Sequence, residues 1–375
     1  MKNVLFVSYY WPPAGGVSVN RILRFYKYLP QFGWNPIILT TDGGDFPFVD
    51  ESLTQEVRPE TKVYRAKNVS LFAALKGVKA DASSFVPYGF TDVSQDTWKS
   101  KLMRFLKFNI VPDTRILWAN SAYRVAKEIL QAEKVDLIFS SSPPQTNHLI
   151  ASKLSKTFKI PWVADLRDPW SDVFWVAKHQ ARLPWISSID KKIEKSTLSK
   201  ASHLVSVTPS WVQRYQERIG VETSLIYNGY EPKMFEADDN ESTQSGSNDS
   251  VGKFHIVYSG SMSYHQRPTL FFEAIKELIT ANNTPKELKV TFIGNYAPFL
   301  SNMVAEYGLE SLVEFVPFGS MQTAVSYMKA ADMLLINGVQ GEDDGVIPSK
   351  LFDYFGARKS ILAFDLSGNA ESLLH

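Results

Sequence analysis

The 375-residue sequence contains no cysteine. Disulfide bonds and thiolate metal sites are therefore excluded, and since this absence fits a reducing cytosol, we expect a cytoplasmic protein. An excess of charge of one sign is also lacking, because 40 basic side chains face 39 acidic ones. The resulting net charge of +1 argues against a general nucleic-acid binder, so we expect no nucleic-acid partner.

Long apolar runs and the short motifs of several enzyme classes are missing as well. No run approaches the roughly 20 residues that a membrane-spanning helix needs, so any membrane contact is expected to be peripheral. The sequence has no Walker phosphate loop, no zinc-ligand spacing and no serine nucleophile elbow. It has no Asp-x-Asp triplet either, which removes the usual handle for a metal-bridged diphosphate. We therefore expect side chains and helix ends to neutralise such a group, with neither a metal nor another cofactor.

A repeated strand–helix rhythm is present instead. Buried strands are expected at residues 4–7, 36–40, 62–65 and 136–140, and the rhythm restarts at 254–261, 289–294, 313–318 and 331–337. Continuous apolar runs alternating with helices are typical of doubly wound α/β domains with parallel sheets. The length accommodates two such domains, which we place at residues 1–235 and 253–375. The polar residues 236–252 are expected to form a flexible linker or exposed loop.

Two glycines follow the first expected strand and precede a helix expected from Val17 to Leu29. Without side chains, Gly15 and Gly16 would let the backbone approach a phosphate or sugar closely. A tight turn explains two adjacent glycines equally well.

Polar residues also follow later strands of the first domain. His148 lies just after the strand at 136–140, where it is either a proton relay or sugar ligand, or a structural residue. Another strand ends in Asp165-Leu-Arg-Asp168, which places two carboxylates and the guanidinium of Arg167 at the ligand-binding edge. The alternative is an Arg–Asp pair that braces a turn, an interpretation stronger for Asp165 than for Asp168.

The stretch 344–363 predicts a loop, a short helix from about Pro348 to Ala357, and a buried strand from Ser360. Proline suits the first helical turn, where its missing N–H costs nothing. The free N–H groups there, with Ser349 and Lys350, would form a cradle for a diphosphate. Asp353 lies one turn beyond Ser349, placed to accept hydrogen bonds from a ribose. A helix cap and a surface lysine are the alternative interpretation.

Taken in order, these motifs resemble those of retaining glycosyltransferases of family 4, in the subgroup that acts on polysaccharides or lipid-linked glycans. The resemblance rests on the Gly15-Gly16 loop, on Arg-Asp-x-Trp at 167–170, and on a donor signature of two Glu residues separated by seven others. Asp353 stands at the second Glu, whereas the first falls on Gly345. The resemblance implies two Rossmann-like domains facing a cleft, the GT-B architecture. It also implies metal-independent sugar transfer from a nucleotide sugar to a glycan or lipid-linked acceptor, in cell-surface polysaccharide or lipopolysaccharide biosynthesis.

The resemblance also assigns roles to residues. Donor binding would involve Gly15, Gly16, Gly260, Arg267, Gly294, Pro348, Ser349, Lys350 and Asp353. Catalysis would involve Asp168, Arg167 and His148, of which Arg167 and Asp168 would orient the sugar and the acceptor hydroxyl. Two alternatives stay open: a nucleotide-sugar epimerase or hydrolase on the same fold, and a non-catalytic glycan-binding relative, which the missing Glu at Gly345 keeps in play.

Members of the family have a sixth strand in the second domain and a final helix that returns to the first, whereas about five strands can be counted from Phe254. We therefore expect a chain that is truncated at its C-terminal end.

One segment bears on membrane contact. Residues 98–111 predict a basic amphipathic helix, with Trp98, Leu102, Phe105 and Leu106 on one stripe and Lys101, Arg104 and Lys107 off it. Such a helix either lies at an anionic membrane surface or packs on its own domain. A second helix, around 189–201, alternates in charge and is expected to present a solvated face.

Overall fold

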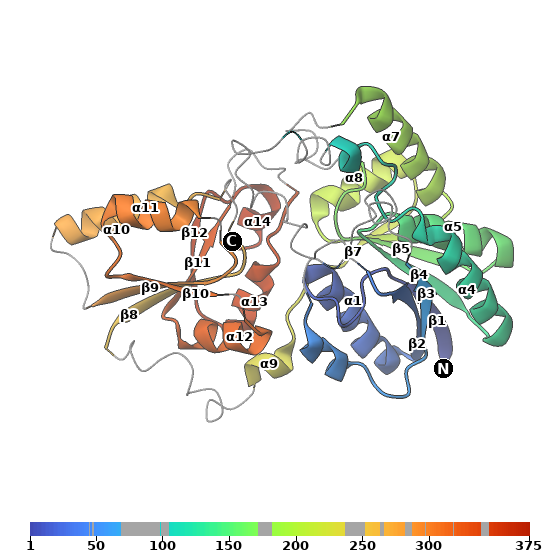
Figure 1. Cartoon of the computed structure of the whole chain (residues 1–375), viewed down its shortest axis with the longest axis horizontal. Helices are drawn as coiled ribbons and strands as arrows, with labels where there is room; N and C mark the ends of the chain where they lie inside the picture. The colour runs from blue at the N-terminus through green and yellow to red at the C-terminus, as the bar shows by residue number, and fades with distance from the viewer. Residues whose placement is uncertain are drawn as a thin grey trace. The chain divides into compact units, whose positions relative to one another are not determined.

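The computed structural model describes residues 1–44, 46, 49–68, 98, 105–171, 182–236, 252–262, 266–281, 287–296, 298–317, 319–338 and 345–375. These residues form two compact units, and the division falls between Tyr227 and Asn228 (Figure 1). The sequence placed the end of the first domain later, at residue 235. Of the expected linker, residues 237–251 lie outside the described part of the chain.

The first unit is built on a seven-stranded parallel sheet with the order β3-β2-β1-β4-β5-β6-β7. Its strands are β1 (Lys2–Val7), β2 (Trp34–Asp42), β3 (Val63–Lys67), β4 (Leu137–Ser142), β5 (Trp162–Leu166), β6 (His203–Ser206) and β7 (Thr223–Leu225). All carboxyl ends of a parallel sheet meet at one edge. The strand order reverses between β1 and β4, and ligands of doubly wound folds bind at such a point.

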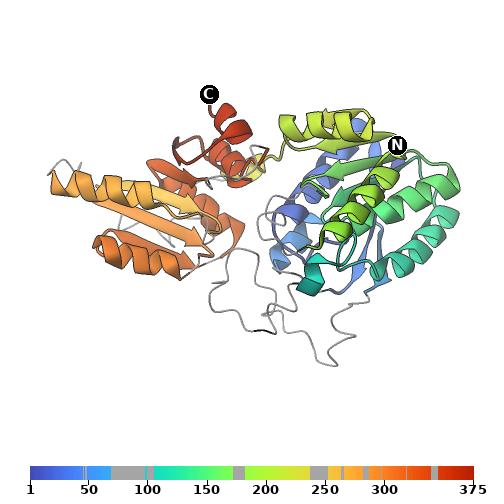
Figure 2. The same cartoon turned by 90° about the horizontal axis from the view of Figure 1, so that it is seen from above.

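Helices cover both faces of this sheet. They are α1 (Val17–Tyr28), η1 (Leu29–Phe32), η2 (Glu51–Glu56), α4 (Trp118–Ala132), α5 (Thr146–Phe158), α7 (Pro184–Leu198) and α8 (Pro209–Ile219). Alternate residues of β1 enter different cores: Leu5 and Val7 pack with α4 and α5, whereas Val4 and Phe6 pack with α1. Figure 2 shows the sheet lying between these helices. Strand β1 is therefore buried on both faces, as its unbroken apolar run predicted.

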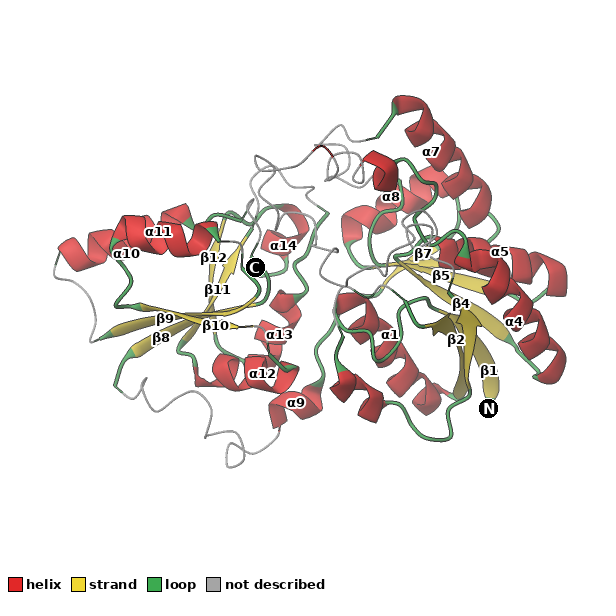
Figure 3. Cartoon of the chain, viewed as in Figure 1, coloured by secondary structure: helices red, strands yellow, loops and turns green. Residues whose placement is uncertain are grey.

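The second unit repeats the arrangement with a five-stranded parallel sheet of order β10-β9-β8-β11-β12. Its strands are β8 (Phe254–Ser259), β9 (Leu288–Gly294), β10 (Val313–Pro317), β11 (Met333–Asn337) and β12 (Ser360–Phe364). Its helices are α9 (Pro232–Glu236), α10 (Thr269–Thr280), α11 (Phe299–Tyr307), α12 (Met321–Ala330), α13 (Lys350–Ala357) and α14 (Gly368–Ser372). Helices α10 and α11 pack on one face, and α12 and α13 on the other (Figure 3). The expected α/β class and doubly wound sheets are confirmed.

Several expected boundaries differ from the structure. Helix α13 begins at Lys350, two residues later than predicted, so Pro348 precedes the helix. The carbonyl of Pro348 nevertheless accepts a hydrogen bond from Leu351 N at 3.0 Å, which closes the turn that leads into the helix. Helix α7 begins at Pro184, where the missing N–H is tolerated, and not at the predicted 189.

The predicted helix at 98–111 lies largely outside the described residues, which include only Trp98 and residues 105–111 of it. Residues 105–108 are helical. Lys101 and Arg104 are outside the described part, so their expected position on this helix stays a prediction. Over the described ranges, no helix combines the length and hydropathy needed to cross a membrane.

Candidate functional site

Two glycines shape the carboxyl ends of β8 and β9. Gly260 follows β8 with φ +115° and Gly294 ends β9 with φ +134°, a region that favours glycine. A Cβ on Gly294 would lie 2.4 Å from the carbonyl oxygen of Gly260, which no side chain can tolerate. Gly260 N in turn donates to Ile293 O at 2.8 Å. Gly294 thus has a structural reason to be glycine, namely that it lets the backbone at Gly260 pack against β9.

Lys350 extends from the start of α13 to this same point. Its Nζ donates to the hydroxyl of Tyr258 and to Ser261 O, the latter at 3.3 Å, and lies 3.8 Å from the centre of the Tyr258 ring. A Cβ on Gly260 would lie 3.4 Å from that Nζ. The structure therefore brings together Gly260 and Lys350, two expected donor-site residues that stand ninety positions apart.

The partners of the Lys350 ammonium among the described residues are neutral. Burial lowers the pKa of Lys350 to about 7, because the charged form is desolvated. Burial also raises the pKa of Tyr258 well above its usual value, so this phenol stays neutral. Its hydroxyl donates to Ser261 O at 2.8 Å and accepts from Lys350. A bound anion at this point would favour the protonated lysine.

Tyr354 supports the same corner and was not singled out in the sequence. Its hydroxyl accepts from Ser259 N at 2.9 Å and donates to Leu335 O at 2.9 Å, and burial raises its pKa. It lies four residues after Lys350, on the same face of α13. That spacing is the signal that could have identified it.

The remaining expected donor residues are less closely tied to Lys350. Ser349 precedes α13 as its N-cap without a side-chain capping bond, and Asp353 is half-buried in the first turn. Arg267 is exposed, and its guanidinium lies 5.4 Å from the centre of the Phe299 ring at the start of α11. Contact with Phe299 therefore holds the Arg267 guanidinium beside the start of α11. Gly345, which stands where the family has a Glu, is buried.

In the first unit, Gly16 is the N-cap of α1 with φ +95°, and Gly15 precedes it at the end of the β1 loop. The positive φ explains glycine at position 16 without a ligand. Its carbonyl accepts from Val19 N and Asn20 N at 3.0 and 3.1 Å, which starts the helix. The tight-turn interpretation therefore fits the geometry of this loop.

The carboxylates after β5 have different environments. Asp165 is fully buried, pairs with Arg21 at 2.6 Å, and accepts from Ser141 Oγ at 2.6 Å. It braces α1 against β4 and β5. Asp168 pairs with Arg167 at 2.5 Å, and these side chains retain 24% and 16% exposure. Only the second pair is open to a ligand.

His148 is completely buried. Ser140 Oγ lies 2.8 Å from its Nδ1 and accepts from Trp162 Nε1 at 2.7 Å, so hydrogen bonds through the serine join the imidazole to Trp162. Its ring stacks on Trp170 with centroids 5.9 Å apart. Burial lowers the pKa of His148 to about 3, so the ring is neutral near pH 7. This geometry favours the structural interpretation over the proton relay.

A polar cluster at the same sheet edge was missed by the sequence analysis. Asp113 accepts from Thr146 N at 2.7 Å and from Arg115 N at 2.8 Å, and burial raises its pKa. Burial likewise raises the pKa of Tyr10, although the positive charges of Arg115 and Arg167 act to lower it. Asp113 and Arg115 lie in an irregular segment without periodicity, so no pattern marked them. Within the described ranges, no three His, Asp or Glu side chains gather as a metal site would require.

A protein-family model matches part of the first unit. The model of Glycosyltransferase Family 4 matches residues 90–233. The comparison with curated proteins gave no match.

Solved structures resemble the whole chain. HepE of Anabaena, solved with UDP and glucose, is 14% identical with a TM-score of 0.60, and the match covers 100% of this chain and 83% of HepE. The sucrose-phosphate synthase of Thermosynechococcus elongatus is 14% identical with a TM-score of 0.57, over 98% and 82%. S. aureus TarM is 11% identical with a TM-score of 0.55, over 100% and 88%. At these identities the likeness establishes the fold. The chain has the GT-B fold of these glycosyltransferases, and its residues 90–233 match the Family 4 model.

Proposed function

We propose that the second unit binds the diphosphate of a nucleotide sugar at Lys350 and Gly260. The chain then transfers the sugar, with retention of configuration and without a metal, to a glycan or lipid-linked acceptor. The observation that carries this proposal is the placement of the Lys350 ammonium at the carboxyl end of β8, against the backbone of Gly260 and Ser261.

The partners of Lys350 support an anion site. Among the described residues, they are a phenol, a carbonyl and an aromatic ring, none of which carries charge at neutral pH. A buried ammonium with neutral partners is poorly compensated, and such perturbed groups gather at functional sites. A diphosphate would supply the missing negative charge through charge-assisted hydrogen bonds.

The ligands of the structural neighbours support the same ligand class. HepE was solved with UDP-glucose as well as with UDP, and the E. coli trehalose-6-phosphate protein with UDP-2-fluoro glucose. TarM was solved with α-GlcNAc-glycerol and UDP, and WaaB is a lipopolysaccharide outer core galactosyltransferase. By analogy, we infer a uridine nucleotide sugar and an acceptor in lipopolysaccharide or another surface polysaccharide.

Different residues would bind the diphosphate, the ribose and the transferred sugar. Negative charge develops on the leaving diphosphate, and Lys350 with the N–H groups at the start of α13 would stabilise it in place of a metal. Asp353 would bind the ribose. In the first unit, Asp168 and Arg167 would orient the sugar and the acceptor hydroxyl. Gly345 offers no carboxylate, so Asp353 is the acidic residue that remains from the two-Glu signature.

Isothermal titration with UDP, GDP and ADP tests the donor site directly. Lys350→Ala is expected to weaken binding of the preferred diphosphate by about 1.5–3 kcal/mol, since a charge-assisted contact is lost. Lys276→Ala is the matched control, because it removes an exposed lysine from α10 of the same unit and should bind normally. Equal affinity of wild type and Lys350→Ala would remove Lys350 from the site.

Metal independence has its own test. Sugar transfer is expected to proceed at the same rate in excess EDTA as in Mg²⁺. Loss of turnover in EDTA with recovery on adding Mg²⁺ would contradict this part of the proposal.

A further inference from the structure

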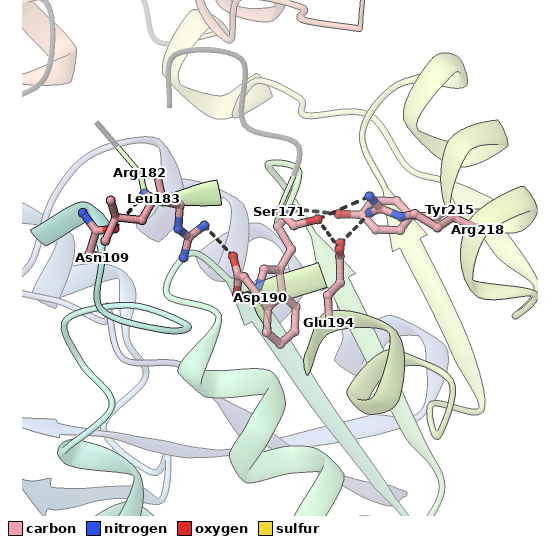
Figure 4. Close-up of polar contacts among 9 residues, drawn as sticks. Asn109, Ser171, Arg182, Leu183, Asp190, Glu194, Tyr215 and Arg218 are labelled. Atoms are coloured by element: carbon pink, nitrogen blue, oxygen red, sulfur yellow. Dashed lines mark hydrogen bonds and ion pairs between the residues drawn. The ribbon is translucent and has the colours of Figure 1, made fainter. Parts of the chain in front are cut away.

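The outer face of α7 carries basic and apolar side chains but no acidic one. Both acids of this helix, Asp190 and Glu194, are buried. Figure 4 shows them turned toward the body of the first unit: Asp190 accepts from Trp170 Nε1 at 3.0 Å and from Arg182 at 2.6 Å, and Glu194 pairs with Arg218 at 2.6 Å. The negative charges of α7 are therefore neutralised inside the protein.

This inward pairing changes the charge that α7 presents to solvent. The alternating sequence predicted a solvated face, and the exposed lysines Lys191, Lys192 and Lys195 agree with it. Arginines from outside the helix neutralise its two acids. The charged side chains that α7 itself presents outward are therefore all basic.

Apolar side chains share this face. Trp185 is 58% exposed and Ile189 is 42% exposed, and their i, i+4 spacing places them on one stripe of the helix. Lys192 lies three residues beyond Ile189 and continues the same stripe. Large apolar groups exposed beside lysines form an amphipathic surface whose apolar half is open to solvent.

A second apolar pair lies beside the start of α7. The side chain of Asn109 accepts from Leu183 N at 2.9 Å and donates to Phe105 O at 2.7 Å, so a single amide joins the two segments. Phe105 and Leu106 are 42% and 37% exposed. The apolar part of the surface therefore extends beyond α7 itself.

We propose that this α7 surface docks the protein on an anionic lipid surface. It consists of Trp185, Ile189, Lys191, Lys192 and Lys195, with Phe105 and Leu106 beside them. Tryptophan prefers the interfacial zone of a bilayer, and lysines near it are attracted to anionic headgroups. A helix with a basic arc and exposed aromatic and aliphatic groups lies in the plane of such an interface. The proposal is independent of the donor site, because α7 belongs to the first unit.

Vesicle flotation tests the charge contribution. Wild-type protein is expected to float with phosphatidylcholine vesicles that contain about one third phosphatidylglycerol, to stay behind with phosphatidylcholine alone, and to dissociate at high salt. The triple change Lys191→Gln, Lys192→Gln and Lys195→Gln should weaken partitioning about 100-fold, at about fivefold per lysine. The matched control changes three other exposed lysines of the first unit to Gln, namely Lys127, Lys134 and Lys156, and should float like wild type.

A second variant separates a membrane from a soluble polyanion. Trp185→Ser with Ile189→Ser keeps every lysine and should weaken partitioning at least about tenfold, since apolar burial is lost. If this variant floats like wild type while the lysine variant does not, the surface binds anions and not a bilayer, and the proposal is wrong. Wild-type protein that ignores anionic vesicles, or equal losses in the lysine variant and its control, would also overturn it.

Discussion

Two cations near the ligand-facing strand ends, half-buried Lys350 in the second unit and buried Arg21 in the first, have opposite kinds of partners. Arg21 forms a two-pronged ion pair with Asp165 and donates to Tyr227 O at 3.1 Å. Lys350 contacts a phenol, a carbonyl and a ring face. A cation satisfied by a carboxylate fixes structure. A cation held among neutral groups keeps its capacity to bind an anion, so the difference separates a brace from a binding site.

The largest effect is expected from breaking the brace. Asp165→Asn should lower the free energy of unfolding by about 3–5 kcal/mol, because the Arg21 guanidinium is left buried without its counter-charge. Chemical denaturation measures this loss. Adding Arg21→Met should recover much of it, since the unpaired charge is then gone. A single variant as stable as wild type would mean that the pair is not a brace.

A smaller effect is expected from the exposed pair. Asp168→Asn should lower sugar transfer by about 100-fold, which is the low end for a group that assists proton transfer. Its free energy of unfolding should change by less than about 1 kcal/mol, because a partly exposed ion pair contributes little. Turnover and denaturation curves of the same preparation provide the comparison. A variant that loses stability as Asp165→Asn does, with no separate loss of turnover, would make Asp168 a brace as well.

The smallest expected effect is the pH dependence of UDP binding, which separates Lys350 from the ion-paired Arg21. Burial lowers the pKa of Lys350 to about 7 in the free protein, and a bound diphosphate would raise it. Binding of UDP should therefore take up a proton above pH 7, and affinity should fall by up to about tenfold per pH unit there, or about 1.4 kcal/mol. Titration in buffers of different ionisation enthalpy detects this uptake. Lys350→Met should bind weakly, with the same affinity at every pH above 7.

The same pKa has a consequence for stability. The unfolded chain keeps Lys350 protonated up to its ordinary pKa of 10.5, whereas the folded chain releases the proton near 7. Between these pH values the unfolded state binds more protons than the folded state. The contribution of Lys350 therefore raises the free energy of unfolding as pH rises. The wild-type melting temperature should therefore rise relative to that of Lys350→Met between pH 7 and 10. An unchanging difference would contradict a lowered pKa.

The sequence predicted the strands well, because buried strands rest on local signals, and it also named Lys350 and Gly260, which the structure brings together and whose role in donor binding stays a proposal. Apolar runs such as 4–7 identify buried parallel strands directly, and Lys350 follows a proline that marks a helix start. The partner of Lys350 was not predictable in the same way. Tyr258 lies one residue before the end of β8, far from α13 in the sequence, and an aromatic residue in an apolar strand looks like ordinary core.

Charge patterns were the weaker guide. The alternating charges of α7 suggested a solvated face, and its lysines are exposed. Its two acids, Asp190 and Glu194, are instead buried and pair with Arg182 and Arg218, which lie outside the helix. Asp113 was missed for a similar reason, because its partner Thr146 lies 33 residues away at the start of α5. Periodicity reports which side of an element is buried, but it does not report which polar groups meet there.

The contact between Gly260 and Gly294 has a consequence for protein engineering. It joins main chain to main chain, so this contact between the ends of β8 and β9 does not depend on the side chains around it. Tyr296 and Phe315, whose rings lie 4.6 Å apart just beyond β9 and within β10, are not part of that contact. Libraries aimed at the proposed donor site can therefore vary these two rings while both glycines are kept constant.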